Sequence, residues 1–240
     1  SLSRGRKALE KSDYDSAIRE FTKVTEQSTD PSLISESSRF LADIYIAQKK
    51  DYKMGLKYLD VSINTSANAL SSRESMKRKA AVLFHHLSRY DEAIPLYVRL
   101  LGSDQLSPAE TGEYRLNLAK SYFLLSQFQQ ARIEAQRVLK DSEDPQHRDR
   151  ASKLIADTYI SGDGDGKDAA EQYKKIMGDI QDVETKKDMA LNLALWLEQK
   201  EKYKEAFTVL ENLNLKEDEF IAAKMKQLDR LYLLQTRRPK

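Results

Sequence analysis

The 240-residue sequence contains no cysteine, so disulfide bonds and thiol chemistry are excluded. Glycine and proline are scarce, at eight and five residues, which argues against a β-rich or disordered chain. No apolar run approaches the roughly 20 residues that span a bilayer, and no signal peptide is visible. Neither sign of charge dominates, because 40 Lys and Arg residues are interleaved with 38 Asp and Glu residues. This composition suits long, solvated helices and gives no net field toward nucleic acid or a membrane surface.

Catalytic motifs are missing as well. The only histidines are His85, His86 and His147, and the sequence has neither a nucleophile elbow nor a phosphate-binding loop. On a helix, His85 and His86 would point about 100° apart, so they would not easily face one metal ion together. We therefore expect no enzyme activity, no metal site and no cofactor.

One pattern recurs along the whole chain. An aromatic residue (a glycine in the fifth copy) is followed three positions later by a small residue and then, after four more, by an apolar or aromatic residue. The small residues of the six copies are Ala17, Gly55, Ala93, Ala131, Ala169 and Ala206. They are 38 residues apart in the first four steps and 37 apart in the last. Self-similarity at such a fixed period is the signature of a solenoid.

A second helical segment precedes each small residue. In "LNLAKSYFLL", Leu118, Ala119 and Tyr122 share one helical face, and "FLADIYIA" and "LIADTYIS" are close relatives of this segment. Each unit is therefore predicted to be a helix, a short turn and a second helix, with small residues where the two helices cross closely. Three loops separate units: Asp30-Pro31, Gly102 to Pro108 and Asp141 to Pro145.

We therefore predict an all-α fold, arranged as one extended domain over residues 1–240. The six repeats are expected at residues 1–30, 31–68, 69–106, 107–144, 145–181 and 182–218. The segment "EFIAAKMKQLDRLYLLQ" is predicted to form a lone helix at 219–236 that seals the array, as a solenoid needs for solubility, or alternatively docks a partner. Pro95 falls inside a second helix, which it is expected to bend without disrupting the array.

These motifs resemble the tetratricopeptide repeat (TPR) family. "GRKALEKSDYDSAIREF" follows the family pattern through Gly5, Ala8, Tyr14, Ala17 and Phe21. "NLAKSYFLLSQFQQARIEA" follows it through Leu118, Ala119, Tyr122, Phe128 and Ala131. The resemblance covers about residues 2–213. It implies a right-handed superhelical solenoid of helix-turn-helix repeats whose concave groove holds an extended peptide or a helix of a partner protein.

The repeats are longer than the usual period of about 34 residues. In this they resemble repeats of bacterial envelope lipoproteins that assist outer-membrane assembly and cell division. The compartment stays open between the cytoplasm and the bacterial periplasm or envelope. Ser1 falls inside the expected first helix, so we expect the chain to be a soluble fragment that lacks the N-terminal part of a longer protein.

In the TPR family, side chains beside the Leu-Ala step of each first helix face the groove. Carried over to this sequence, the resemblance implies a set of partner-binding residues: Arg39, Phe40, Asp43, Arg78, Lys79, His85, Asn117, Lys120, Phe123, Arg150, Lys153 and Asp157. Charged residues alternate with apolar and aromatic ones around these positions. Such a mixture suits a binding groove, although a charged helix face can also be merely solvated.

Part of this set also resembles a carboxylate clamp. In chaperone-type TPR proteins, basic and Asn side chains of successive first helices hold a C-terminal carboxylate, and Arg78, Asn117 and Arg150 fall on matching places. Val82 and Leu154 depart from that pattern, because an Asn and a basic residue are expected there.

The turn "SGDGDG", Ser161 to Gly166, approximates the start of a calcium loop. Asp163 and Asp165 alternate with Ser161, and Gly166 stands at the sharp turn. However, Ser replaces the usual first Asp ligand, and Gln172 replaces the closing Glu. A flexible acidic turn is the alternative interpretation.

The predicted function is thus a protein-protein interaction scaffold that holds a partner in its groove, without inserting into a membrane. One alternative is self-association, as a homodimer or as an assembly component of a bacterial envelope or motility complex, through the first repeat or the final helix. Another is RNA binding by helical repeats, against which the balanced charge argues.

Overall fold

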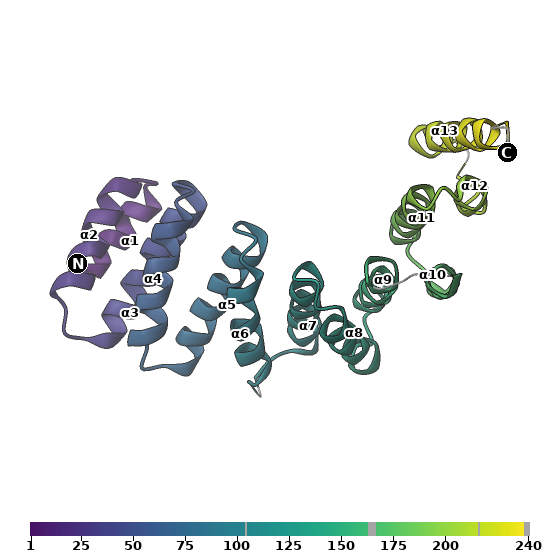
Figure 1. The fold of residues 1–240 in the computed structure, drawn as a ribbon. Coiled ribbons are helices and arrows are strands. Elements are labelled where there is room, and N and C mark those ends of the chain that lie inside the picture. The colour runs from purple at the N-terminus through teal and green to yellow at the C-terminus, as the bar shows by residue number, and fades with distance from the viewer. Residues whose placement is uncertain (104, 163–166, 216, 238–240) are drawn as a thin grey trace. The chain divides into compact units, whose positions relative to one another are not determined.

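The computed structural model describes residues 1–103, 105–162, 167–215 and 217–237 (Figure 1). Its elements within these ranges are all helices, which confirms the predicted all-α class. The first helices of the repeats are α1 (Leu2–Glu10), α3 (Pro31–Asp43), α5 (Ala69–His85), α7 (Pro108–Leu124), α9 (Pro145–Ser161) and α11 (Val183–Gln199). The second helices are α2 (Tyr14–Gln27), α4 (Tyr52–Thr65), α6 (Tyr90–Leu101), α8 (Phe128–Asp141), α10 (Lys167–Asp179) and α12 (Tyr203–Glu211). A π-helical turn, η1 (Ile44–Gln48), extends α3, and α13 (Glu219–Thr236) follows the last pair.

The chain forms two compact units, Ser1–Leu106 and Ser107–Lys240. The first unit contains α1 to α6 and the second contains α7 to α13, and within each unit consecutive helices pack against each other. The boundary coincides with the border expected between the third and fourth repeats. One continuous domain over residues 1–240 stays a prediction.

Three of the predicted loops act as helix-start signals. The side chains of Asp30, Ser107 and Asp144 accept hydrogen bonds from backbone N–H groups of the helix that follows. In each case proline occupies the first helical position, where a backbone N–H would have no helical partner anyway. Ser107 and Glu110 complete a reciprocal capping box. These local interactions fix where α3, α7 and α9 begin.

The turn between the two helices of a repeat contains a residue in the left-handed conformation. These residues have φ angles between 53° and 59°: Ser12, Lys50, Ser88, Ser126 and Glu201. They follow the same period as the small residues, and the position expected in the fifth repeat lies outside the described residues. After Ser126, the N–H of Gln127 donates to the carbonyl of Tyr122 at 2.8 Å, which closes α7 in a Schellman motif. The same backbone device therefore reverses the chain in repeat after repeat.

The recurring small residues lie where helices cross. All six are buried: Ala17, Gly55, Ala93, Ala131, Ala169 and Ala206. A Cβ atom on Gly5 would lie 2.4 Å from the Phe21 ring, and one on Gly55 would lie 2.4 Å from Ile46. The helices approach so closely at these points that larger side chains do not fit, which is the physical basis of the periodic pattern.

Pro95 lies inside α6, and the helix continues beyond it to Leu101. Proline lacks the N–H that would donate to the carbonyl of Asp91, and both residues are exposed. The helix therefore loses one hydrogen bond at its solvated side and no core contact.

The last helix packs against α12. Ile221 and Leu228 are fully buried, whereas Phe220 and Leu234 on the same helix are exposed. α13 thus covers the end of the second unit with one face and leaves large apolar side chains on its surface.

Candidate functional site

Every predicted groove residue lies on a first helix, and within each unit these helices are neighbours. α3 contacts α5 in the first unit, and α9 contacts both α7 and α11 in the second. Figure 1 shows α7, α9 and α11 in one row, with α8, α10 and α12 in another. Side chains from successive repeats can therefore meet on the row of first helices.

In the first unit, three of the predicted charges bind neighbouring helices of the chain itself. Arg78 of α5 forms an ion pair with Asp43 of α3. The Nζ atom of Lys79 lies 2.5 Å from a carboxylate oxygen of Asp60 on α4. Arg39 is half-buried, and no carboxylate within residues 1–103 and 105–106 forms an ion pair with it. The charges of Arg78 and Lys79 are thus largely neutralised within the fold.

The aromatic members of the set in the first unit differ in exposure. Phe40 is half-buried and stacks on Phe21, with 4.9 Å between ring centroids, and the Arg6 guanidinium lies 5.6 Å above it. His85 is exposed and meets Phe84 edge-on at 4.7 Å. Phe40 therefore contributes to packing, and His85 is the more accessible of the two.

In the second unit, Arg150 and Asn117 converge on a carboxylate of the chain itself. Arg150 of α9 donates two hydrogen bonds to Glu113 of α7, at 2.7 and 3.4 Å, and the Asn117 side chain donates to the same carboxylate. Burial acts to raise the pKa of the Glu113 carboxyl, but Arg150, with smaller contributions from His147 and Asn117, lowers it below the ordinary value. Asn117 is also buried. Two of the three residues that resemble a carboxylate clamp, Asn117 and Arg150, thus bind the carboxylate of Glu113. The third, Arg78, belongs to the first unit.

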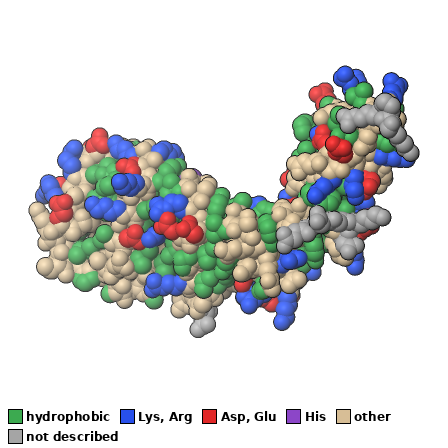
Figure 2. All heavy atoms as spheres, viewed as in Figure 1, with side chains coloured by type: hydrophobic (Ala, Val, Ile, Leu, Met, Phe, Trp, Pro, Cys, Tyr) green, Lys and Arg blue, Asp and Glu red, His purple; other side chains and the backbone are tan. Residues whose placement is uncertain are grey.

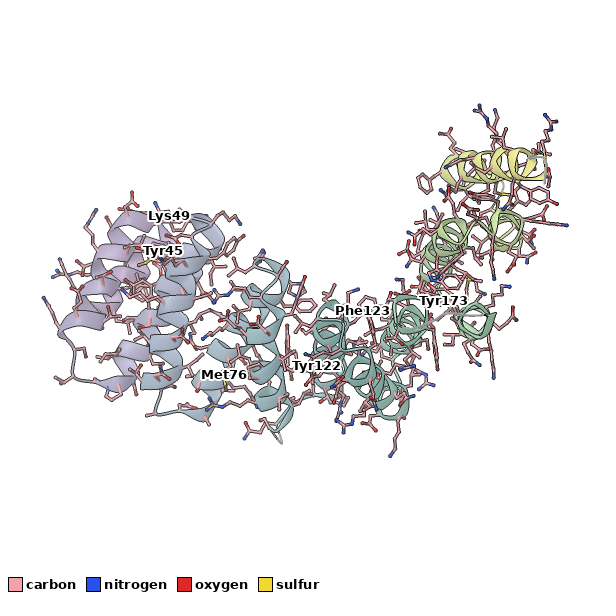
Figure 3. All side chains as sticks on the ribbon, viewed as in Figure 1. Tyr45, Lys49, Met76, Tyr122, Phe123 and Tyr173 are labelled. Carbon is pink, nitrogen blue, oxygen red and sulfur yellow. The ribbon has the colours of Figure 1, made fainter. Side chains whose placement is uncertain are left out.

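Asp157 organises a buried polar group on α9. One of its oxygens accepts a hydrogen bond from the Tyr173 hydroxyl at 2.9 Å, and the other accepts one from the Lys153 ammonium group at 3.1 Å. Burial, followed by the charge of Asp157, raises the pKa of the Tyr173 hydroxyl far above its ordinary value, so it stays a neutral donor. Figure 3 labels Tyr173 on α10, next to α9. Both carboxylate oxygens are occupied, so Asp157 orients Lys153 from below the surface.

Lys120 has no such partner. Within the described part of the second unit, no carboxylate lies within ion-pair distance of its ammonium group. Burial, followed by the nearby charge of Lys153, lowers the pKa of the Lys120 ammonium group, and Asp157 offsets only part of this effect. Its Nζ atom lies 5.0 Å from the ring centroid of Phe123, which is half-buried on the same helix (Figure 3). Lys120, Lys153 and Phe123 therefore combine a surplus positive charge with an apolar ring.

Metal-ligand geometry is not found in the described ranges. No three His, Cys, Asp or Glu side chains converge there as metal ligands would. His86 stacks on Tyr52 at 4.7 Å, so its ring has a different neighbour from that of His85. Asp163, Asp165 and Gly166 of the candidate calcium turn lie outside the described residues. None of the described helices has the length and apolarity needed to cross a bilayer.

The comparisons with known proteins agree with the repeat architecture. A family model described as "Tetratricopeptide repeat" matches residues 78–148, which include Lys120 and Phe123. The crystal structure of YrrB, described as a TPR protein with an unusual peptide-binding site, has a TM-score of 0.51 and 17% identity over 86% of this chain and 97% of that chain. A crystal structure of nearly identical TPR-like repeats from Podosopora anserina has a TM-score of 0.55 and 19% identity, over 84% of this chain and 100% of the other.

Residues 78–148 match the tetratricopeptide-repeat family model, and the fold of the chain is that of TPR solenoids. At such identities the likeness to the two structures concerns the fold. No curated protein sequence matches the chain.

The ion pairs between repeats of this TPR-like solenoid were not expected from the sequence. Asp43 and Arg78 are 35 positions apart, and Glu113 and Arg150 are 37 apart. Opposite charges separated by about one period are therefore the sequence signal for contacts between successive first helices. The surplus charge at Lys120 has no comparable signal, because it depends on burial and on which lysine Asp157 binds.

Proposed function

We propose that the chain is a non-catalytic scaffold that binds a segment of a partner protein on the first helices of its second unit, with Lys120 as the anchor. The observation that carries this proposal is a half-buried ammonium group with a lowered pKa and no carboxylate partner in the described part of the unit. A charge left in such a place destabilises the folded protein, which a binding role would explain. A partner carboxylate would supply the missing counter-charge.

The neighbours of Lys120 suggest what kind of segment would fit. Lys153 adds a second ammonium group that is already held in place by Asp157. Phe123 offers an aromatic ring beside the charge, so an apolar side chain next to an acidic one would be favoured. The proposed ligand is therefore a segment with a carboxylate, either an acidic side chain or a C-terminus, adjacent to an apolar residue.

The remaining predicted residues divide into two groups. Arg39 and His85 stay candidates for partner contact in the first unit, because Arg39 has no ion pair among the described residues and His85 is exposed. The other residues make contacts within the chain and would support the arrangement of the first helices: Phe40, Asp43, Arg78, Lys79, Asn117, Arg150 and Asp157.

Selection of a phage-displayed random peptide library on the immobilised protein would test the proposal. We expect selected peptides to be enriched in Asp or Glu next to an apolar residue, and to lose affinity for a Lys120→Met variant. A Lys140→Met variant is the matched control, because Lys140 is an exposed lysine on the second helix α8. Peptides that bind all three proteins equally would place recognition elsewhere.

Self-association is the second candidate function, and α13 favours it. Phe220 and Leu234 are 65% and 53% exposed, so this one helix offers two large apolar side chains that a second copy of the chain could cover. Light scattering over a concentration series would show whether the parent protein forms dimers and whether a Phe220→Ser, Leu234→Ser variant does not. A role in a bacterial envelope or motility complex would build on such assembly.

A further inference from the structure

A pocket in the first unit contains two arginines and is separate from the proposed partner site. It has a volume of about 390 Å³, which is within the range of small-ligand sites. Its lining comes from the start of α5, the end of α6 and the loop that follows α6. Arg73 and Arg99 supply its charge, and Met76 and Leu100 supply apolar surface. Figure 3 labels Met76 on α5.

Among the residues that the structure describes, neither guanidinium group has an acidic partner. Arg73 donates hydrogen bonds of 3.3 Å to the Ser103 hydroxyl and to the backbone and side-chain oxygens of Gln105, all of which are neutral acceptors. Its Nε atom is buried and has no hydrogen-bond partner among the described residues. Arg99 is exposed, and no described residue of this unit forms an ion pair with it. Two permanent positive charges thus share one pocket without a described counter-charge.

We infer that this pocket binds a phosphate group, either free or as the phosphomonoester of a larger ligand. Two arginines match a phosphomonoester, which carries about −1.5 to −2 charges at neutral pH, better than they match a single carboxylate. Arginine N–H groups suit tetrahedral oxyanions, and the buried Nε of Arg73 would gain the acceptor that it lacks. The apolar lining by Met76 and Leu100 leaves room for the group that carries the phosphate.

Isothermal titration calorimetry with the full chain would test this inference, with inorganic phosphate, O-phosphoserine and glutamate as probes at constant ionic strength. We expect saturable binding of both phosphate probes and at least ~tenfold weaker binding of glutamate, since one charge-assisted hydrogen bond is worth about a factor of ten or more. Tighter binding of O-phosphoserine than of inorganic phosphate would indicate a carried phosphate group, and the reverse order a free ion.

Two variants test whether phosphate binds in this pocket. Arg99→Ala should weaken binding of the preferred phosphate probe at least ~tenfold while the protein stays folded, because Arg99 is exposed and has no described partner. Arg4→Ala, which removes an exposed arginine of α1 in the same unit, should leave binding unchanged. The inference is overturned if neither phosphate probe binds, if glutamate binds as well as O-phosphoserine, or if the Arg99→Ala variant binds like the parent.

Discussion

At the scale of single residues, Lys120 is the position where stability and the proposed function oppose each other. Its ammonium group is disfavoured by burial and by the charge of Lys153. A lysine whose pKa is lowered in the folded state destabilises that state below the lowered pKa, and this destabilisation disappears as the pH rises toward the ordinary value of 10.5. A residue kept for folding alone would not show this behaviour.

We therefore predict that Lys120→Met raises the thermal midpoint at pH 7 while it weakens peptide binding. The gain over the parent should shrink as the pH approaches 10.5, where Lys120 in the parent loses its proton. Burial and the charge of Asp157 raise the pKa of the Tyr173 hydroxyl, so it stays protonated in both proteins over this pH range. Thermal melts of the parent, Lys120→Met and Lys140→Met between pH 7 and 10.5 would measure the effect. A lower midpoint for Lys120→Met at pH 7 would show that Lys120 stabilises the fold.

The glycine of the first repeat is a second test at this scale. Phe21 is fully buried and stacked on Phe40, so it cannot move away from a Cβ on Gly5. We predict that Gly5→Ala lowers the free energy of unfolding by about 1–3 kcal/mol through overpacking, although alanine is the better helix former. Gly178→Ala is the control, because nothing lies within 4 Å of its Cβ, and it should be neutral or stabilise by up to about 1 kcal/mol. Urea denaturation of both variants would decide, and equal effects would contradict the close-contact explanation.

Residue patterns predicted the core better than they predicted the binding surface. The small residues at fixed spacing, such as Ala93 and Ala131, are buried as the period required, because close helix crossings restrict side-chain size. Charged residues carry no such restriction. Arg150 and Lys120 look equivalent in the sequence, yet Arg150 binds Glu113 and Lys120 binds no carboxylate among the described residues. Their different surroundings depend on contacts between repeats.

At the scale of elements, the sequence predicted helices and their order but not the geometry of the turns. Helix periodicity, and proline after Asp30, Ser107 and Asp144, mark the helices well. The left-handed residues within the repeats have no such marker, because serine, lysine and glutamate occupy positions where glycine is the usual choice. The π-helical turn Ile44–Gln48 likewise has no marker in the sequence, since its residues do not interrupt the helical pattern.

Replacing one of these left-handed residues with glycine should stabilise the protein. Ser126 has a φ angle of 59° and is exposed, so Ser126→Gly relieves backbone strain without loss of a core contact. We predict a gain of about 0.5–1 kcal/mol in the free energy of unfolding, measured by urea denaturation. Ser126→Ala at the same position should give no gain, because alanine retains the Cβ atom that makes the conformation costly. If glycine were no better than alanine, the turn would be relaxed in the parent.

At the scale of the whole molecule, the balance of charge bears on the alternative of RNA binding. The 40 basic and 38 acidic residues give a formal net charge of only +2, and Figure 2 shows both signs intermixed on the face that it displays. Non-specific binding to nucleic acid depends on many simultaneous phosphate contacts, and its salt dependence reports their number. A scaffold with interleaved charges offers few contiguous contacts, even if one pocket holds a phosphate group.

We predict that a fluorescently labelled single-stranded RNA shows no saturable binding at 50 mM salt in anisotropy titrations up to about 100 μM protein, the upper range of non-specific affinities. One phosphate of the RNA could still occupy the pocket of Arg73 and Arg99 and give weak binding. In that case a plot of the logarithm of the binding constant against the logarithm of the salt concentration should have a slope of about −0.7, the value for a single contact on a single strand. This weak binding should vanish in Arg99→Ala. RNA-binding repeats would behave differently, because several phosphates contacted at once give a slope several times steeper that survives the loss of one arginine. A steep slope in both proteins would therefore replace the scaffold proposal with an RNA-binding function.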